Sequence, residues 1–274
     1  MSISPPNLRP LSVGEILDKA FRLYRANFRM FIGIAVLFYV PFGVIQVLSQ
    51  VFFRDTTLAV NLQNFISILL WGALTWAASR VYLGLPASSG EAFQAGRHRF
   101  WSVWGASFLE GMALIPAIIA IALGALGGVP GVLIMSFIAV PYIAFITTRW
   151  GINIPGIIIE NVGARAGLDR SWALTSKDAW HALGTLFTSS LLVYLVSGLP
   201  GILVGYASRQ YGILPELGPF VSIIIAQLGS LISTPLSASA GVILYYDLRV
   251  RREGFDLQLI LNTPVPEPEN AYDQ

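Results

Sequence analysis

The chain has 274 residues, of which 55% are hydrophobic and only 12% are charged, and its mean hydropathy is +0.67. A soluble domain carries about twice that share of charge, so a soluble globular enzyme and a largely disordered chain are both disfavoured. The chain has no cysteine, only two histidines and a net charge of +2, which excludes disulfides, thiolate or three-histidine metal sites and general attraction to nucleic acid. This composition indicates an integral membrane protein.

Six apolar stretches are long enough to cross a bilayer, because about 20 helical residues span its hydrocarbon core. The uncharged run between Glu110 and Arg149 is too long for one span, and the turn signal at residues 127–130 divides it into a hairpin. The runs are continuously apolar, which disfavours a β-barrel. We expect no cleaved signal peptide, because the first run already has full span length. In chain order the predicted spans are residues 30–53, 56–79, about 101–126, about 131–150, 179–208 and 217–246.

The basic residues predict the orientation of these spans. With six crossings, both termini and the loops after the second and fourth spans share one side. Of the 17 lysines and arginines, only Arg54 and Arg209 fall on the opposite side. Loops rich in basic residues stay in the cytoplasm, so we expect a protein of the cytoplasmic (inner or plasma) membrane with both termini cytoplasmic.

Similar phrases recur along the chain and predict internal repeats. Residues 12–15 and 88–91 both match a helix capping box, in which a serine and the glutamate three positions later bond the first free amides. The sequence LDKAFRL at 17–23 returns as LDRSWAL at 168–174. We therefore expect an all-α protein built from three tandem units, each an amphipathic cytoplasmic helix followed by a two-span hairpin. The expected repeats cover residues 11–86, 87–160 and 161–262 of a single domain at 1–262, followed by a disordered, acidic, proline-rich tail at 263–274.

The first cytoplasmic helix offers a candidate surface for lipid headgroups. Arg22, Arg25 and Arg29 fall on its polar face, where they would meet anionic headgroups if the apolar face lay in the membrane interface. Alternatively, the helix packs against the protein's own loops. The apolar face consists of Ile16, Leu17, Ala20, Phe21, Tyr24 and Phe28.

Glu110 is the clearest candidate for an intramembrane polar site, because a carboxylate within a span is costly. It would act as a proton-titrating or cation-coordinating group, or it would only fix helix packing. Gln46 and Gln227 are further polar candidates, which either line a common cleft or bond between helices. The sequence contains no nucleotide loop and no Ser/His/Asp set, so we expect no enzymatic activity, cofactor or metal.

Three stretches together resemble a known family. They are LSVGEILDKAFRLYR at 11–25, IEN at 159–161 with LDRSWALT at 168–175, and YYDLRVRREGFDL at 245–257. They are similar to the glycerophosphoryl diester phosphodiesterase membrane domain family of bacterial and archaeal multi-pass proteins, over residues 8–261. In some members this module is joined to a soluble phosphodiesterase barrel, which this chain lacks. The resemblance therefore implies a helical membrane module without known catalytic residues.

The matched motif positions include Glu160, Asp247, Arg249, Arg251, Glu253 and Asp256. They either pair with one another at the cytoplasmic interface or form a site for lipid headgroups or a partner. The candidates for that docking site are Arg170, Asp247, Arg249, Arg251 and Arg252, together with the three arginines of the first helix.

Two functions fit these patterns. The favoured one is a non-catalytic scaffold or accessory subunit that binds a protein partner in the membrane or at the cytoplasmic face. The alternative is a protein that handles lipids or small solutes in a polar cleft near Glu110. Membrane lipids are expected partners in both cases, and nucleic acid in neither. Convergence of Glu110, Gln46 and Gln227 on one cavity would favour the second function.

Overall fold

The computed structural model describes residues 9–212 and 217–257, and these residues contain helices and no strand. The predicted tail at 263–274 and the last few residues of the third predicted repeat lie outside the described residues. The helical elements are α1 (Val13–Ala26), α2 (Phe28–Phe53), α3 (Thr57–Tyr82), α4 (Ser89–His98), α5 (Phe100–Ala125), α6 (Gly128–Trp150), α7 (Asn153–Glu160), α8 (Ala164–Thr175), α9 (Ala179–Val193), the π-helical turn η1 (Tyr194–Gly198), α10 (Leu199–Tyr211) and α11 (Gly218–Glu253).

The described residues include six helical stretches that are long and apolar enough to cross a membrane, which confirms a multi-pass membrane protein. The predicted hairpin after the second span is also present, as α5 and α6. Two spans are followed by more helix than predicted. After the fourth, a turn at residues 151–152 is followed by the separate helix α7, which ends at Glu160, whereas the sixth continues unbroken past Asp247 to Glu253. Glu160 and Glu253 both pair with Arg170 of α8.

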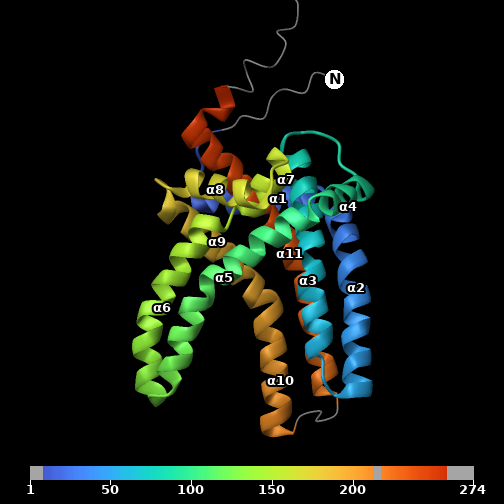
Figure 1. Cartoon of the computed structure of the whole chain (residues 1–274). Coiled ribbons are helices and arrows are strands. Elements are labelled where there is room, and N and C mark those ends of the chain that lie inside the picture. Colours follow the sequence, from blue (N-terminus) through green and yellow to red (C-terminus); the bar gives the residue numbers. More distant parts are fainter. Residues whose placement is uncertain (1–8, 213–216, 258–274) are drawn as a thin grey trace, which may run out of the picture.

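Figure 1 shows α1, α4, α7 and α8 together at one end of the molecule, from which the long helices extend. We call these four elements the short-helix layer. Helix α11 is central, since it packs against α1, α2, α3, α9 and α10. The largest fully buried side chains include Phe31 of α2, Leu70 of α3 and Tyr245 of α11, so the main core surrounds α11.

The hairpin of α5 and α6 stands apart from α2, α3 and α11 over most of its length (Figure 1). Its contacts with the rest of the chain involve α3, α4, α7, α8 and α9. Large apolar side chains cover its outer surface, among them Leu126, which is 85% exposed, and Phe137, which is 83% exposed. Such side chains are compatible with a hydrocarbon environment, whereas water would oppose their exposure.

Both predicted capping boxes are present, at the starts of α1 and α4. In the first, the amide of Glu15 donates to Oγ of Ser12 over 3.3 Å, and the amide of Ser12 donates to Oε2 of Glu15 over 2.8 Å. The backbone amide of Ser12 and the guanidinium of Arg9 lower the pKa of Glu15 from 4.5 to about 2. The carboxylate therefore stays ionised, and accepts these bonds, throughout the neutral and mildly acidic range.

We expect Ser12→Ala to destabilise α1 by about 1 kcal/mol, because one free amide loses its acceptor. The lowered pKa of Glu15 adds a pH dependence: its contribution is complete above pH 4.5 and is lost as the pH falls to about 2. Thermal unfolding of wild type, Ser12→Ala and Glu15→Gln in detergent at pH 7, 4 and 2.5 measures both effects. The difference between wild type and Glu15→Gln should shrink at the lowest pH, and a constant difference would contradict the role of the Glu15 carboxylate. Ser88→Ala is the matched variant in α4.

Candidate functional site

A cavity of about 250 Å³, lined by both polar and apolar side chains, lies among the long helices, and we call it the Glu110 chamber. Its walls come from α3, α5, α6, α7, α9 and α11, together with Gly151 between α6 and α7. Among its lining residues, Glu110 is the one with an ionisable side chain. The other polar lining residues carry hydroxyl groups: Thr75, Thr147, Ser189, Ser190 and Ser237.

Asn153, the first residue of α7, holds the Glu110 side chain. Its Nδ2 donates a hydrogen bond of 3.1 Å to Oε2 of Glu110. The Asn153 side chain is buried, and its Oδ1 has no hydrogen-bond partner among the described residues. An amide oxygen without a partner is costly to bury, and of the two residues it is Glu110 that lines the chamber.

The break between α6 and α7 places Asn153 beside Glu110. A Cβ atom on Gly151 would lie 2.4 Å from the carbonyl oxygen of Thr147 and 2.5 Å from Cδ1 of Leu186, so only glycine fits there. Helix α6 ends at Trp150, and the chain changes direction before α7 begins. The sequence analysis missed Asn153. The available signal was a polar residue two positions after a glycine in an otherwise apolar run.

An apolar groove of about 310 Å³ adjoins the chamber and runs between α6 and α9. We call it the α6–α9 groove. Thr147, Leu186 and Ser190 line both spaces, so these three residues form the boundary between the chamber and the groove. The remaining lining of the groove is apolar: Val140, Ile143, Ala144, Leu183 and Phe187, with the hydroxyl-bearing Thr148.

Gln46 and Gln227 come together, but not with Glu110. They meet through Gln63 of α3, whose Oε1 accepts a 2.9 Å bond from Gln227 and a second bond from Gln46. Gln227 lines a separate apolar cavity between α2 and α11. The three predicted polar residues therefore do not share one cavity: the glutamines connect α2, α3 and α11, and Glu110 lines the chamber. Gln63 was not predicted, although it is a polar amide within the second apolar run.

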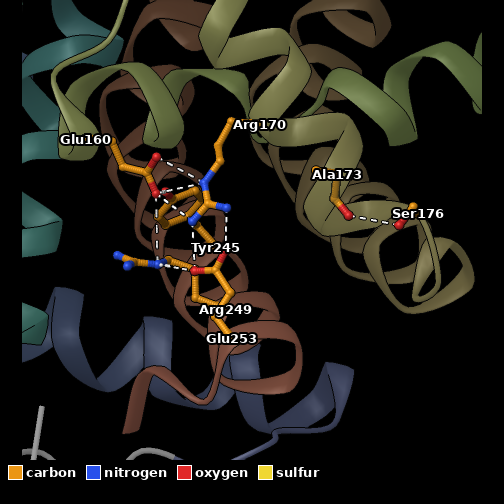
Figure 2. A network of polar contacts seen from close by, with 7 residues as sticks. All are labelled: Glu160, Arg170, Ala173, Ser176, Tyr245, Arg249 and Glu253. Atoms are coloured by element: carbon orange, nitrogen blue, oxygen red, sulfur yellow. Dashed lines mark hydrogen bonds and ion pairs between the residues drawn. The ribbon is translucent and has the colours of Figure 1, made fainter. Parts of the chain in front are cut away.

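A second polar feature connects α7, α8 and α11, and Figure 2 shows it from close by. Arg170 of α8 donates from Nε to both carboxylate oxygens of Glu160, over 2.8 and 3.0 Å, and its Nη atoms bond Glu253. The Tyr245 hydroxyl bonds Glu160, and Arg249 donates to Glu253 over 3.1 Å. We call these five residues the Arg170 network. The bonds to Glu253 and Glu160 raise the pKa of Arg170, so it stays charged.

A third group surrounds Asp247, whose side chain is fully buried. One carboxylate oxygen accepts a 2.6 Å bond from the amide of Leu11, and the other contacts Nε2 of His181 at 2.9 Å and Nε of Arg251 at 2.8 Å. Arg251 also donates to the carbonyl oxygen of Leu11 over 2.6 Å. The Asp247 group, meaning these four residues, connects the segment before α1 with α9 and α11. Nothing in the sequence indicates the contact between His181 and Asp247, because the two residues lie 66 positions apart.

The candidate docking residues divide into two sets. Arg22, Arg25 and Arg29 are exposed, although Arg22 also pairs with Asp18 at 2.6 Å. The other five bond within the chain: Nε of Arg252 lies 3.1 Å from Asp178 of the loop before α9, and Arg170, Asp247, Arg249 and Arg251 belong to the groups described above. Within the first set, Arg25 and Arg29 present exposed guanidinium groups, whereas Arg22 is engaged with Asp18.

Comparison of the chain with protein-family models, with curated proteins and with solved structures finds no match. The resemblance to the glycerophosphoryl diester phosphodiesterase membrane domain stays a prediction from the sequence.

Proposed function

We propose that this membrane protein handles an amphiphilic lipid, whose polar head occupies the Glu110 chamber and whose hydrocarbon chain lies in the α6–α9 groove. One observation carries the proposal: the polar chamber and the apolar groove share Thr147, Leu186 and Ser190. An amphiphile needs a polar and an apolar compartment in contact, because either half is unfavourable in the other's surroundings. A small polar solute has no apolar part that could occupy the groove.

The side chains that line the chamber indicate which lipid headgroup would bind there. Glu110 offers a carboxylate, and the five hydroxyl-bearing residues donate or accept hydrogen bonds. None of the residues that line the chamber is basic, so a purely anionic head would lack a counter-charge. A head with an ammonium group satisfies the carboxylate, because charge-assisted hydrogen bonds are the stronger ones. The proposed ligand is therefore a lipid with a primary ammonium head, such as an ethanolamine phospholipid.

Glu110→Gln tests this assignment, since it removes the charge and keeps the shape. We expect retention of a phosphatidylethanolamine to fall about 10-fold, because a hydrogen bond to a charged group contributes about 1.5–3 kcal/mol. Native mass spectrometry of purified protein, titrated with that lipid in detergent, measures the bound fraction. Asp169→Asn is the matched control, because Asp169 is an exposed carboxylate on α8. Equal retention by wild type and Glu110→Gln would refute the proposal.

The order of elements supports the finer architecture that the sequence predicts. The short helices α1, α4 and α8 each precede a pair of long helical segments, as three tandem repeats require. We propose this repeat organisation, and we propose that the short-helix layer faces the cytoplasm of the cell because the basic residues concentrate there. Labelling of single introduced cysteines in intact cells tests the orientation. A cysteine at Ser89 should be protected from an impermeant reagent, and one at Asp55 should react.

An accessory subunit is a second candidate function, favoured by the separation of Glu110 from Gln46 and Gln227 and by the hairpin of α5 and α6. Its exposed apolar residues, including Ile118, Leu133 and Phe137, face away from the rest of the chain and offer a surface to a partner's membrane helices. Native mass spectrometry after gentle extraction from the source membrane separates the two functions. A stoichiometric protein partner supports the accessory subunit, whereas stoichiometric ammonium lipid without a protein supports lipid handling.

A further inference from the structure

Arg149, the residue before the last of α6, is a cation without a carboxylate partner. It forms no ion pair with any of the described residues, whereas Arg170 and Arg251 each bond a carboxylate. Its Nη1 donates a 2.9 Å hydrogen bond to the carbonyl oxygen of Thr175 in α8. Its Nη2 has no hydrogen-bond partner in the described part of the chain and, unlike Nε, is not buried. One nitrogen of this guanidinium is therefore open to a ligand from outside the protein.

Two aromatic rings hold the guanidinium in place. Its central carbon lies 5.4 Å from the ring centroid of Phe145 and 5.3 Å from that of Trp172, which are distances at which a cation is attracted to an aromatic face. The two rings also contact each other edge to face, with centroids 5.6 Å apart. Phe145 is 46% exposed and Trp172 is 40% exposed, so the group lies at the protein surface. We call Arg149, Phe145, Trp172 and Thr175 the Arg149 site.

An exposed apolar stripe runs along α6 from this site. Phe145, Tyr142 and Ile138 precede Arg149 by 4, 7 and 11 positions, so they share one face of the helix with it. Tyr142 is 36% exposed and Ile138 is 62% exposed, and Figure 1 shows α6 at the edge of the molecule. Eleven helical residues extend about 16 Å, which is about one leaflet of a hydrocarbon core roughly 30 Å thick. The stripe therefore offers one acyl chain a continuous surface that begins at Arg149.

The Arg149 site lies at the level of lipid headgroups. Arg149 is at the end of α6 that contacts α8 of the short-helix layer, and tryptophans such as Trp150 and Trp172 are typical of this level. The charged group that a bilayer supplies there is the phosphate of a phospholipid. A guanidinium binds phosphate through charge-assisted hydrogen bonds. An unpaired cation beside an apolar phase is unfavourable, so a phosphate also relieves the cost of placing it there.

We infer that the Arg149 site binds the phosphate of an anionic phospholipid from the surrounding bilayer, whose acyl chain lies along Phe145, Tyr142 and Ile138. The site has no carboxylate that would pair with an ammonium head, and Lys177, two positions after Thr175, is an exposed second cation. At 100° per residue, the stripe lies on the face of α6 opposite Ala144 and Thr147, which line the α6–α9 groove. It is therefore a separate site from the one proposed for an ammonium lipid.

Lipid titrations of the purified protein in detergent, followed by native mass spectrometry, test the inference. Wild type should bind dioleoyl phosphatidylglycerol about 10-fold more tightly than dioleoylglycerol, which has the same chains and no phosphate. Arg149→Gln should lose about 10-fold in affinity for phosphatidylglycerol. Arg149→Lys should lose about threefold, because it keeps the charge but not the planar donors. Equal affinity of wild type for the two lipids would overturn the inference, and this comparison needs no variant to fold.

The controls distinguish this site from other cations, from the chamber and from a soluble anion. Arg54→Gln removes an exposed arginine at the opposite end of α2 and should leave the affinity for phosphatidylglycerol unchanged. Glu110→Gln should also leave it unchanged, so the two lipid sites succeed or fail independently. Glycerol 3-phosphate should not displace the lipid, and displacement would refute the role of the apolar stripe. Wild-type affinity in an Arg149→Gln variant of wild-type thermal stability would place the lipid elsewhere and refute the assignment.

Discussion

Asp247→Ala is expected to lower the free energy of unfolding by about 3–5 kcal/mol, the usual cost of removing one partner from a buried ion pair. The Asp247 carboxylate is fully buried and accepts bonds from the Leu11 amide, His181 and Arg251. Its removal leaves the amide of Leu11 without its acceptor and separates a half-buried guanidinium from its carboxylate. The loss affects three elements at once, since the group connects the start of α1, α9 and α11.

Chemical unfolding in mild detergent, followed by tryptophan fluorescence, measures this effect. Asp247→Asn keeps one acceptor, so its free energy of unfolding should fall less than that of Asp247→Ala. The fall for Arg251→Ala should be smaller still, because Arg251 is partly exposed. Asp169→Asn, on the surface of α8, is the control and should be neutral. A stability of Asp247→Ala within 1 kcal/mol of wild type would show that these bonds contribute little.

Arg170→Ala should also destabilise the protein, but less than Asp247→Ala, because Arg249 remains as a counter-charge to Glu160 and Glu253 and the network is partly exposed. Arg170→Lys should restore only part of the stability, since an ammonium group cannot bond two carboxylates in the planar geometry of a guanidinium. A double-mutant cycle between Arg170→Ala and Glu253→Ala measures the interaction energy between the two side chains. We expect a coupling energy above about 1 kcal/mol, since the residues are only partly exposed.

Glu91→Ala is a matched control for the cycle, because Glu91 lies in α4, which has no contact with α8 among the element pairs that pack together. Arg170→Ala and Glu91→Ala should be additive within about 0.5 kcal/mol. A coupling energy near zero for Arg170 and Glu253 would mean that solvent screens the network and that packing alone connects α8 to α11.

The spans could be predicted from the sequence because their signal is local. Uncharged length identifies a helix in a bilayer, and a run such as residues 127–130 marks its turn. The signal fails where the helical structure after a span includes charged residues, as at Glu160 and Glu253. Those residues are tolerated because they pair with Arg170 of another element, and pairing between distant elements leaves no periodic pattern in a single sequence.

In the candidate site, too, some features could be predicted from the sequence and others could not. Glu110 was identifiable, because a carboxylate within an apolar run is conspicuous. Its partner Asn153 was not, because the break in the helix at Gly151 brings Asn153 beside Glu110. The glutamines illustrate the converse. Gln46 and Gln227 were identified by residue type, yet the face that each helix presents decides that they meet Gln63 rather than Glu110. Residue chemistry indicated the candidates, and tertiary packing determined their grouping.

The Asp247 group has a consequence for the order of biosynthesis. Leu11 leaves the ribosome long before Asp247, which lies 236 positions later. Until α11 has been synthesised and inserted, the segment before α1 lacks its acceptor, and α2 and α3 lack the helix against which they pack. We therefore expect the earlier spans to lack these packing contacts while they lie in the bilayer, and insertion of α11 to complete the core in one step. A nascent chain stalled before α11 should accordingly be a preferred substrate for membrane quality-control proteases.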